Sequence, residues 1–205
     1  MGTCYIIGAG EVGILDFVPD KEDMVIACDG GYRHGKKWGI RMDLVVGDFD
    51  SLGYLPDHLH VVRLKPEKDD TDTGYAVKTG LEKGYREFII YGGIGGRISH
   101  TIANIQLLCG LAEKGCRGML IGKDSWYRVI CNEEITFDQG HTGFLSAFCM
   151  GDMAYGVYEE GLKYALCDAV LRKEYPIGVS NEFIGKESRV SVREGTLLLV
   201  GENKE

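Results

Sequence analysis

The sequence predicts an α/β protein in which an N-terminal, three-layer domain built on a parallel sheet precedes a C-terminal antiparallel β-sandwich. Two observations lead to this fold class. Up to residue 124, short apolar runs alternate with helical patterns, and beyond it short alternating segments are broken by turns that contain Gly and Asn. We therefore expect an α/β domain over residues 1–124 and a β-sandwich domain over residues 125–205.

The first domain should contain strands that are apolar throughout, because helices cover both faces of a parallel sheet. The expected strands are Cys4–Gly8, Met24–Cys28, Asp43–Val46, His60–Leu64, Glu87–Tyr91 and Gly118–Ile121. One helix should follow Thr71-Asp72-Thr73, any of which can cap it, and a second should run from near Ser99 to Gly115. Several of these strands run directly into Gly or Asp, and ligands of parallel sheets bind at the carboxyl ends of the strands.

The second domain should contain short strands and no helix. The expected strands are Trp126–Cys131, Glu134–Phe137, Gly143–Phe148, Leu162–Asp168, Ser188–Val192 and Thr196–Val200. Their alternation of apolar and polar residues is typical of sheets with one buried face, which predicts a sandwich.

Composition excludes several classes of protein. A net charge of −8 argues against a nucleic-acid partner, which would require a basic face. No apolar run is long enough to span a membrane, and the first residues do not resemble a signal peptide. The seven cysteines are scattered and show no C-x-x-C spacing. We therefore expect reduced thiols and a cytoplasmic location.

The segment Gly8-Ala9-Gly10-Glu11-Val12-Gly13 matches the G-x-G-x-x-G pattern of dinucleotide-binding proteins, and Asp29 follows at a suitable distance. Such a site also requires a helix directly after the glycines, but Pro19 interrupts residues 14–23. We therefore interpret the segment as a glycine-rich turn after the first strand.

Acidic residues follow the predicted strands. Asp29 precedes Gly30 and Gly31, Asp48 and Asp50 lie in Gly47-Asp48-Phe49-Asp50-Ser51, and Asp69 and Asp72 lie in Lys68-Asp69-Asp70-Thr71-Asp72-Thr73. Each motif alone could be a local turn or a helix cap. Together they would bring at least four carboxylates to one sheet edge, where like charges repel unless a cation neutralises them. Mg²⁺ suits such oxygen ligands and bridges them to phosphates.

A glycine-rich segment leads into the second predicted helix. Gly92-Gly93-Ile94-Gly95-Gly96-Arg97 offers backbone N–H groups, the helix N-terminus is positive, and Arg97 can bind phosphate bidentately. His100 lies within the first turn of the helix and Asn104 one turn later. This pattern predicts a site for nucleotide phosphates, although it is not a Walker A motif.

Motifs along nearly the whole chain resemble those of thiamine pyrophosphokinases, and they occur in that family's order. The matching motifs are Asp29-Gly30-Gly31, Gly47-Asp48-Phe49-Asp50-Ser51, Lys68-Asp69-x-Thr71-Asp72, Gly95-Gly96-Arg97-x-x-His100-x-x-x-Asn104, Gly161-Leu162-Lys163-Tyr164 and Ser180-Asn181-Glu182. The resemblance implies an α/β nucleotide domain followed by a β-sandwich, and a homodimer with thiamine bound where the subunits meet.

The resemblance also implies the reaction and its residues. A kinase-type transferase would move the diphosphate of ATP to the thiamine hydroxyl, giving thiamine diphosphate and AMP. Asp48, Asp50 and Asp72 would hold Mg²⁺, with Asp69 as a further ligand or as acceptor of the hydroxyl proton. The expected nucleotide-binding residues are Asp29, Gly30, Gly31, Gly95, Gly96, Arg97, His100 and Asn104. Thiamine would contact Ser180 and Asn181 and stack on Phe183 of the partner subunit, with Trp126 as second choice.

The sequence departs from the family pattern at one position, and two other functions also fit the motifs. Ser99 stands where the family usually has Asp before the histidine, although serine can still cap the helix. The acidic motifs serve ATP, so they also fit a diphosphokinase for another alcohol such as a hydroxymethylpterin. A non-catalytic sensor of nucleotide or thiamine diphosphate is the third reading.

Overall fold

The computed structural model describes residues 2–15, 17–50, 52–65 and 70–204. The chain divides into two compact units. Unit 1 comprises Met1–Leu107 and Cys116–Lys123, and unit 2 comprises Leu108–Gly115 and Asp124–Glu205. Among the described helices, none is both long and apolar enough to cross a lipid bilayer.

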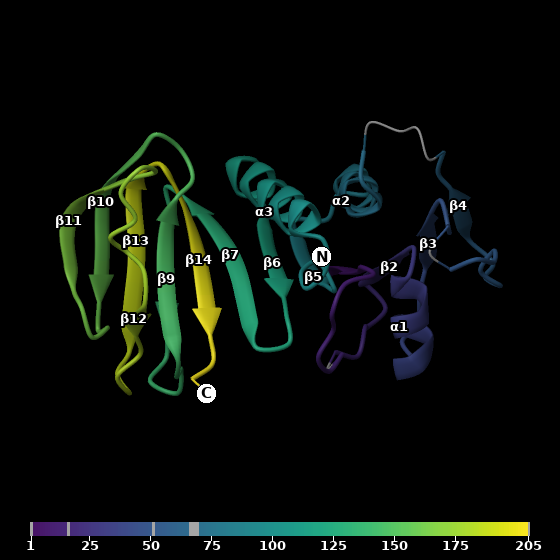
Figure 1. Ribbon diagram of the computed structural model, residues 1–205, viewed down its shortest axis with the longest axis horizontal. Coiled ribbons are helices and arrows are strands. Elements are labelled where there is room, and N and C mark those ends of the chain that lie inside the picture. Colours follow the sequence, from purple (N-terminus) through teal and green to yellow (C-terminus); the bar gives the residue numbers. More distant parts are fainter. Residues whose placement is uncertain (1, 16, 51, 66–69, 205) are drawn as a thin grey trace. The chain divides into compact units, whose positions relative to one another are not determined.

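Unit 1 contains a parallel sheet in the order β6-β5-β1-β2-β3-β4 (Figure 1). Its strands are β1 (Cys4–Ile7), β2 (Met24–Cys28), β3 (Leu44–Gly47), β4 (Val61–Arg63), β5 (Glu87–Tyr91) and β6 (Arg117–Ile121). Each lies within one residue of its predicted bounds, which confirms the parallel sheet. Because all these strands are parallel, their carboxyl ends meet at one edge.

Helices pack on both faces of this sheet. Gly80 of α2 (Asp72–Glu82) approaches the side chains of Cys4 and Phe88 so closely that a Cβ would clash with both. Val25 and Ala27 face the opposite side, because side chains alternate along a strand, and Tyr32 of α1 (Gly31–Trp38) packs with Ala27 there. Unit 1 therefore has the predicted three layers.

The sequence interpretation missed one helix, α1 (Gly31–Trp38). It begins with glycine, has no side-chain cap, and carries a second glycine at position 35. Those features disfavour an isolated helix. Tertiary contacts stabilise the helix instead, because Tyr32 and Gly35 are buried and Gly35 lies against the side chain of Met42. The helix predicted from Ser99 is α3 (Ile98–Glu113).

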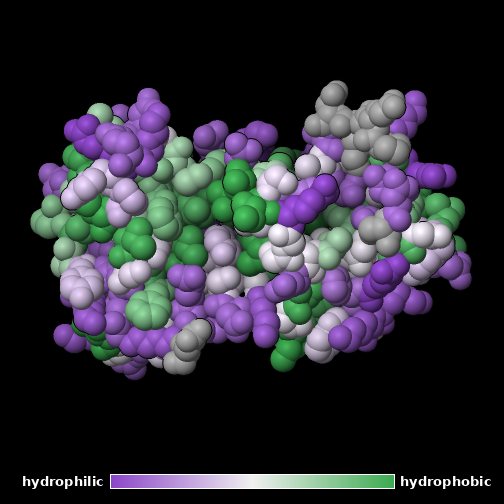
Figure 2. Space-filling view, viewed as in Figure 1, coloured by the Kyte–Doolittle hydropathy of each residue, from purple (hydrophilic) through white to green (hydrophobic). Residues whose placement is uncertain are grey.

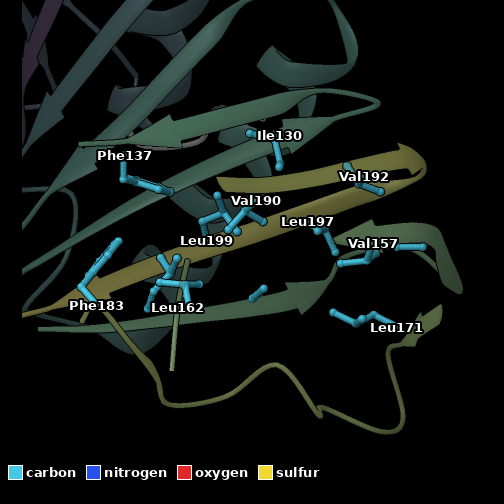
Figure 3. Close-up of a cluster of buried hydrophobic side chains, with 13 residues drawn as sticks. Ile130, Phe137, Val157, Leu162, Leu171, Phe183, Val190, Val192, Leu197 and Leu199 are labelled. Carbon is cyan, nitrogen blue, oxygen red and sulfur yellow. The ribbon is translucent and has the colours of Figure 1, made fainter. Parts of the chain in front are cut away.

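Unit 2 is built from two antiparallel groups of strands, as predicted for a sandwich. One has the order β12-β9-β14-β7 and the other β11-β10-β13-β8. The strands are β7 (Ser125–Cys131), β8 (Glu134–Phe137), β9 (Phe144–Cys149), β10 (Met153–Glu160), β11 (Leu166–Arg172), β12 (Asn181–Glu182), β13 (Ser188–Glu194) and β14 (Thr196–Glu202). Figure 3 shows their buried side chains, with Phe183 and Leu162 at one end of the cluster and Leu171 at the other.

One strand prediction for unit 2 had a wrong start, and two strands were missed. β10 was missed because Gly156 has a positive φ of 62° and the pairing with β11 shifts register nearby, which breaks the expected alternation. The predicted strand Leu162–Asp168 starts too early, since β11 begins at Leu166. Leu162 instead forms an isolated bridge with Phe183. The short strand β12 was also not expected.

Candidate active site

A pocket of about 600 Å³ lies in unit 1 and is lined by residues from the carboxyl ends of its strands and the starts of its helices. Five aspartates contribute to its wall: Asp29, Asp48, Asp50, Asp70 and Asp72. Glycine-rich backbone, Arg97 and His100 contribute further parts of the wall. The structure therefore brings together acidic motifs that lie more than 40 residues apart in the sequence.

Asp48 and Asp50 are presented by a tight turn after β3. Phe49, between them, has a φ of 65°, a backbone conformation that is rare for a bulky residue. Its ring is only 4 % exposed and packs with Ala27 and Tyr32, which holds the turn in this conformation. The amide of Asp50 donates to Oδ1 of Asp48 over 3.1 Å. Burial of Phe49 thus turns both neighbouring carboxylates toward the pocket.

The next acidic group lies at the start of α2. Thr71 is the N-cap, and its Oγ1 accepts a hydrogen bond of 3.0 Å from the amide of Gly74. Asp70 and Asp72 flank the cap, and both line the pocket. Asp69 lies outside the described residues, so its predicted role stays a prediction. The N-terminus of α2, with its positive end, therefore faces the same space as the carboxylates.

The negative charge of this wall is only partly offset by neighbouring side chains. Asp48, Asp50 and Asp70 form no ion pair with any residue that the structure describes. Within those described ranges, no three Asp, Glu, His or Cys side chains converge closely enough to form a ready-made metal site. The donor set nevertheless fits Mg²⁺, since carboxylate oxygens at a phosphate pocket are its usual protein ligands. Asp48, Asp50 and Asp72 remain the predicted ligands.

Two glycine turns are joined side by side in the pocket wall. The amide of Gly8 donates to the carbonyl oxygen of Tyr91 over 2.7 Å, and that of Gly10 to the carbonyl oxygen of Gly92 over 2.9 Å. A Cβ on Gly8 or Gly92 would strike the backbone of the other turn. His34 Nε2 donates to the carbonyl oxygen of Gly10 over 3.1 Å and braces the turn from α1.

The glycine segment after β1 therefore contributes more than a simple turn. Among the described residues between 9 and 23 there is no helix, so the arrangement of a dinucleotide-binding motif is missing. Gly8, Ala9 and Gly10 nevertheless line the pocket. Their position after a central strand of a parallel sheet was the signal that could have identified them. Cys28, Thr71, Thr73, Ile94 and Thr101 also line the pocket and were not predicted.

Four predicted nucleotide-binding residues lie in or beside the second glycine segment. Gly95, Gly96, Arg97 and His100 all line the pocket, and Arg97 directly precedes α3. Asn104 is buried and its Nδ2 donates to the carbonyl oxygen of Gly93 over 2.6 Å. The side chain of Asn104 therefore holds the glycine segment in place.

The structure gives different roles to two glycines expected to bind nucleotide and to the serine expected to cap the second helix. Gly31 is buried, and a Cβ there would strike the carbonyl oxygen of Ile7. This glycine therefore allows α1 to approach β1, and neither it nor Gly30 lines the pocket, although Asp29 does. Ser99 is the second residue of α3, so it is not the N-cap that we expected, and it does not line the pocket.

The predicted thiamine-binding segment lies in unit 2. Ser180 has a φ of 58° and its amide donates to Oγ of the buried Ser146 over 3.0 Å. Asn181 is buried. Phe183 is only 6 % exposed, and its ring contacts Phe137 and His141. This corrects the expectation of an exposed stacking platform, because Phe183 belongs to the apolar core. Trp126 also packs against that core.

The strained non-glycine residues support the importance of these motifs. Of the described non-glycine residues, those with positive φ are Asp29, Phe49, Asn132, Asp168 and Ser180. Three of them, Asp29, Phe49 and Ser180, lie in motifs that the sequence singled out. Such conformations cost free energy and gather at functional sites.

Comparisons with known proteins agree with both units. A model of the thiamin pyrophosphokinase catalytic domain matches residues 16–120, and a model of that family's vitamin B1 binding domain matches residues 132–197. Thiamine pyrophosphokinase from Bacillus subtilis is 27 % identical, with 98 % of each chain covered.

Solved structures extend the likeness. A Bacillus subtilis thiamine pyrophosphokinase structure has a TM-score of 0.85 at 24 % identity, with 99 % of this chain and 100 % of that chain covered. Thiamin pyrophosphokinase from Candida albicans has a TM-score of 0.78 at 15 % identity, with 98 % of this chain and 90 % of that chain covered. These structures share the fold. Because the catalytic-domain model alone spans half of the sequence, the chain belongs to the thiamine pyrophosphokinase family.

Proposed function

We propose that the unit 1 pocket catalyses transfer of the diphosphate group of ATP to the hydroxyl of thiamine. The observation that carries this proposal is the joint exposure of five aspartates, a glycine-rich backbone and Arg97 to one pocket. Carboxylates that bind a metal ion and N–H groups that bind phosphate are the two requirements of phosphoryl-type transfer. Membership of the family supports thiamine as the acceptor.

In this proposal, Asp48, Asp50 and Asp72 hold Mg²⁺, which when bound neutralises the phosphate charge. The N-termini of α2 and α3, together with Arg97 and His100, orient the phosphates. The thiamine hydroxyl attacks the β-phosphorus and AMP leaves, so positioning in line determines the rate. Asp69 keeps its proposed role as a further ligand or as acceptor of the hydroxyl proton.

Thiamine binding is assigned to the Ser180-Asn181 segment of a partner subunit in a homodimer. Exposed apolar side chains around this segment support a subunit contact: Tyr164, Ile177, Val179 and Ile184 are all more than 40 % exposed. Figure 2 shows hydrophobic side chains on the surface among hydrophilic ones. Tyr164, which is 61 % exposed, replaces Phe183 as the proposed aromatic platform.

A cytoplasmic location is part of the same proposal. All seven cysteines are free thiols, and several are buried in apolar surroundings. Burial raises the pKa of the Cys4 thiol to about 12, so that cysteine stays protonated and unreactive. Free thiols persist in a reducing compartment.

The test is to incubate the protein with ATP, Mg²⁺ and thiamine and to measure AMP. We expect AMP and thiamine diphosphate in equal amounts. AMP with a hydroxymethylpterin alone would favour the other diphosphokinase, and binding without AMP would favour a sensor. Either result would overturn the proposal.

The shared site can be tested by mixing subunits. Asp50→Asn disables the unit 1 pocket and Asn181→Ala disables the unit 2 segment. If each site takes one part from each subunit, exchange should restore about a quarter of wild-type activity, since half of the dimers are mixed and each has one intact site. No recovery after exchange would exclude a site shared between subunits.

A further inference from the structure

A buried carboxyl group lies next to the proposed thiamine-binding segment. Glu159, near the end of β10, is only 2 % exposed and faces the interior of unit 2. Its Oε2 accepts a hydrogen bond of 2.5 Å from Nδ2 of Asn181. Burying a carboxyl group costs free energy unless it gains compensating interactions, so this placement needs a reason.

The side-chain amide of Asn181 uses all of its hydrogen-bonding capacity within the protein. Nδ2 donates to Glu159 and to the carbonyl oxygen of Tyr164 over 2.6 Å. Oδ1 accepts from the amides of Tyr164 and Glu182, both over 2.9 Å. Two donors and two lone pairs are the full inventory of this group. Asn181 therefore has no hydrogen bond left for a substrate.

These contacts show that the Asn181 side chain stabilises the local structure. They join the Gly161–Tyr164 turn to β12, two segments nearly 20 residues apart in the sequence. The amide of Lys163 adds a hydrogen bond of 3.0 Å to the carbonyl oxygen of Glu182. The exposed Tyr164 and the strained Ser180 both adjoin this junction. The orientation of this amide thus fixes the backbone of Tyr164, and Ser180 directly precedes Asn181 in the chain.

Glu159 selects that orientation. An Asn side chain rotated by half a turn would place its oxygen against Glu159 and its NH₂ group against the amides of Tyr164 and Glu182. An acceptor at Glu159 favours the observed orientation, because it requires the NH₂ group on its own side.

The surroundings of Glu159 favour its neutral form. Burial raises the pKa of Glu159, and the hydrogen bond from Asn181 only partly opposes this. Charged side chains on the neighbouring segments are engaged elsewhere: Lys163 pairs with Glu182, Arg189 with Glu160 and Glu134, and Asp168 with Arg193.

A second buried polar atom lies nearby on the strand paired with β10. In the described part of the chain, Oε1 of Glu159 and Oγ of Ser188 have no hydrogen-bond partner. Val190 of β13 lies opposite Glu159, so Ser188 is its diagonal neighbour on the same face. In the neutral form of Glu159, a proton on Oε1 would leave Oε2 able to accept from Asn181.

We propose that Glu159 is a positioning residue for thiamine: it fixes the Asn181 amide, which in turn fixes Tyr164 and Ser180 for the substrate. This inference rests on the proposed function and deepens it, since it assigns a role to a group that does not itself touch the substrate. It also changes the role of Asn181 from a direct thiamine contact to a residue that shapes the site.

The test compares three variants in steady-state kinetics. Glu159→Leu keeps an apolar volume in the core but removes the acceptor, and should raise the KM for thiamine about tenfold, with the KM for ATP within twofold of wild type. Glu159→Gln keeps an acceptor for Asn181 and should leave both constants within about twofold. Glu160→Gln is the matched control, since its carboxylate is exposed and paired with Arg189.

The outcomes are distinct. If Glu159→Leu does not fold, Glu159→Asp, which withdraws the carboxyl by one methylene, should raise the thiamine KM in the same direction. An unchanged thiamine KM in the folded variant, an equal rise for ATP, or a Gln variant as impaired as the Leu variant would overturn the inference. Failure of wild-type protein to form AMP with thiamine would instead overturn the proposed function, and the inference with it.

Discussion

Carboxyl groups serve the two units in opposite ways. In unit 1, Asp48 and Asp50 line an open pocket and have no ion-pair partner among the described residues, so their charge is available to a cation. In unit 2, Glu159 is buried against an amide and favours the neutral form. The same chemical group is therefore available to a cation where it lines a pocket and forms a hydrogen bond to an amide where it is buried.

The largest expected effect comes from removing charge at the pocket. Asp50→Asn should reduce AMP formation at least a hundredfold, because the Mg²⁺ that Asp50 is proposed to hold would lose a carboxylate ligand and, with it, its position at the phosphates. The thermal midpoint should stay close to that of wild type, since Asp50 is exposed. Asp57→Asn, exposed in the same unit and outside the pocket lining, is the control and should remain fully active. An active Asp50→Asn enzyme would show that Asp50 is not one of the proposed Mg²⁺ ligands.

The next largest effect concerns the backbone wall of the pocket. Gly92 has a φ of 62° and a Cβ there would lie 2.5 Å from the carbonyl oxygen of Gly8, so Gly92→Ala should lower the free energy of unfolding by about 2 kcal/mol or more. A Cβ on Gly96 would meet no neighbouring atom, so Gly96→Ala should change the free energy of unfolding by less than about 0.5 kcal/mol. Urea unfolding measures both, and equal losses would contradict the steric argument.

A smaller effect is expected at the start of α2. Thr71→Ala removes the oxygen that accepts from Gly74 and should lower the free energy of unfolding by about 1 kcal/mol. Thr71→Ser keeps the oxygen and should restore most of the loss. If the two substitutions have equal effects in urea unfolding, the cap does not contribute and the placement of Asp72 depends on other contacts.

The buried carboxyl group of Glu159 should make the stability of the protein depend on pH. Because burial raises the pKa of Glu159 in the folded protein, its stabilising contribution is complete below the unfolded value and is lost as pH rises through the folded value. Glu159→Gln cannot titrate, so it should match wild type in acid and become progressively more stable than wild type as pH rises. Thermal midpoints of both proteins from pH 5 to pH 9 measure this difference; parallel profiles would show that Glu159 is not buried in solution.

Sequence reasoning worked best where periodicity and chain direction agree. Alternation of apolar strands with helices predicted the parallel sheet of unit 1, and the placement of acidic motifs after strands predicted that Asp29, Asp48 and Asp72 share one edge. It failed for α1, whose glycine start gives no helix signal, and for β10, where Gly156 interrupts the alternation. It also assigned Phe183 to an exposed binding surface. The sequence alone does not distinguish an aromatic residue of the core from one in a binding site when either lies beside a motif.

The joined glycine turns have a consequence for how the site responds to a ligand. The amides of Gly8 and Gly10 donate to the backbone carbonyls of Tyr91, the last residue of β5, and of Gly92, so their hydrogens exchange with solvent only when the two turns separate. A nucleotide held against this wall would oppose that separation. Deuterium uptake at the first turn would therefore slow when ATP binds, even though those amides point toward protein and not toward phosphate. Hydrogen exchange in the segment that matches the dinucleotide-binding pattern would thus report whether a nucleotide occupies the pocket.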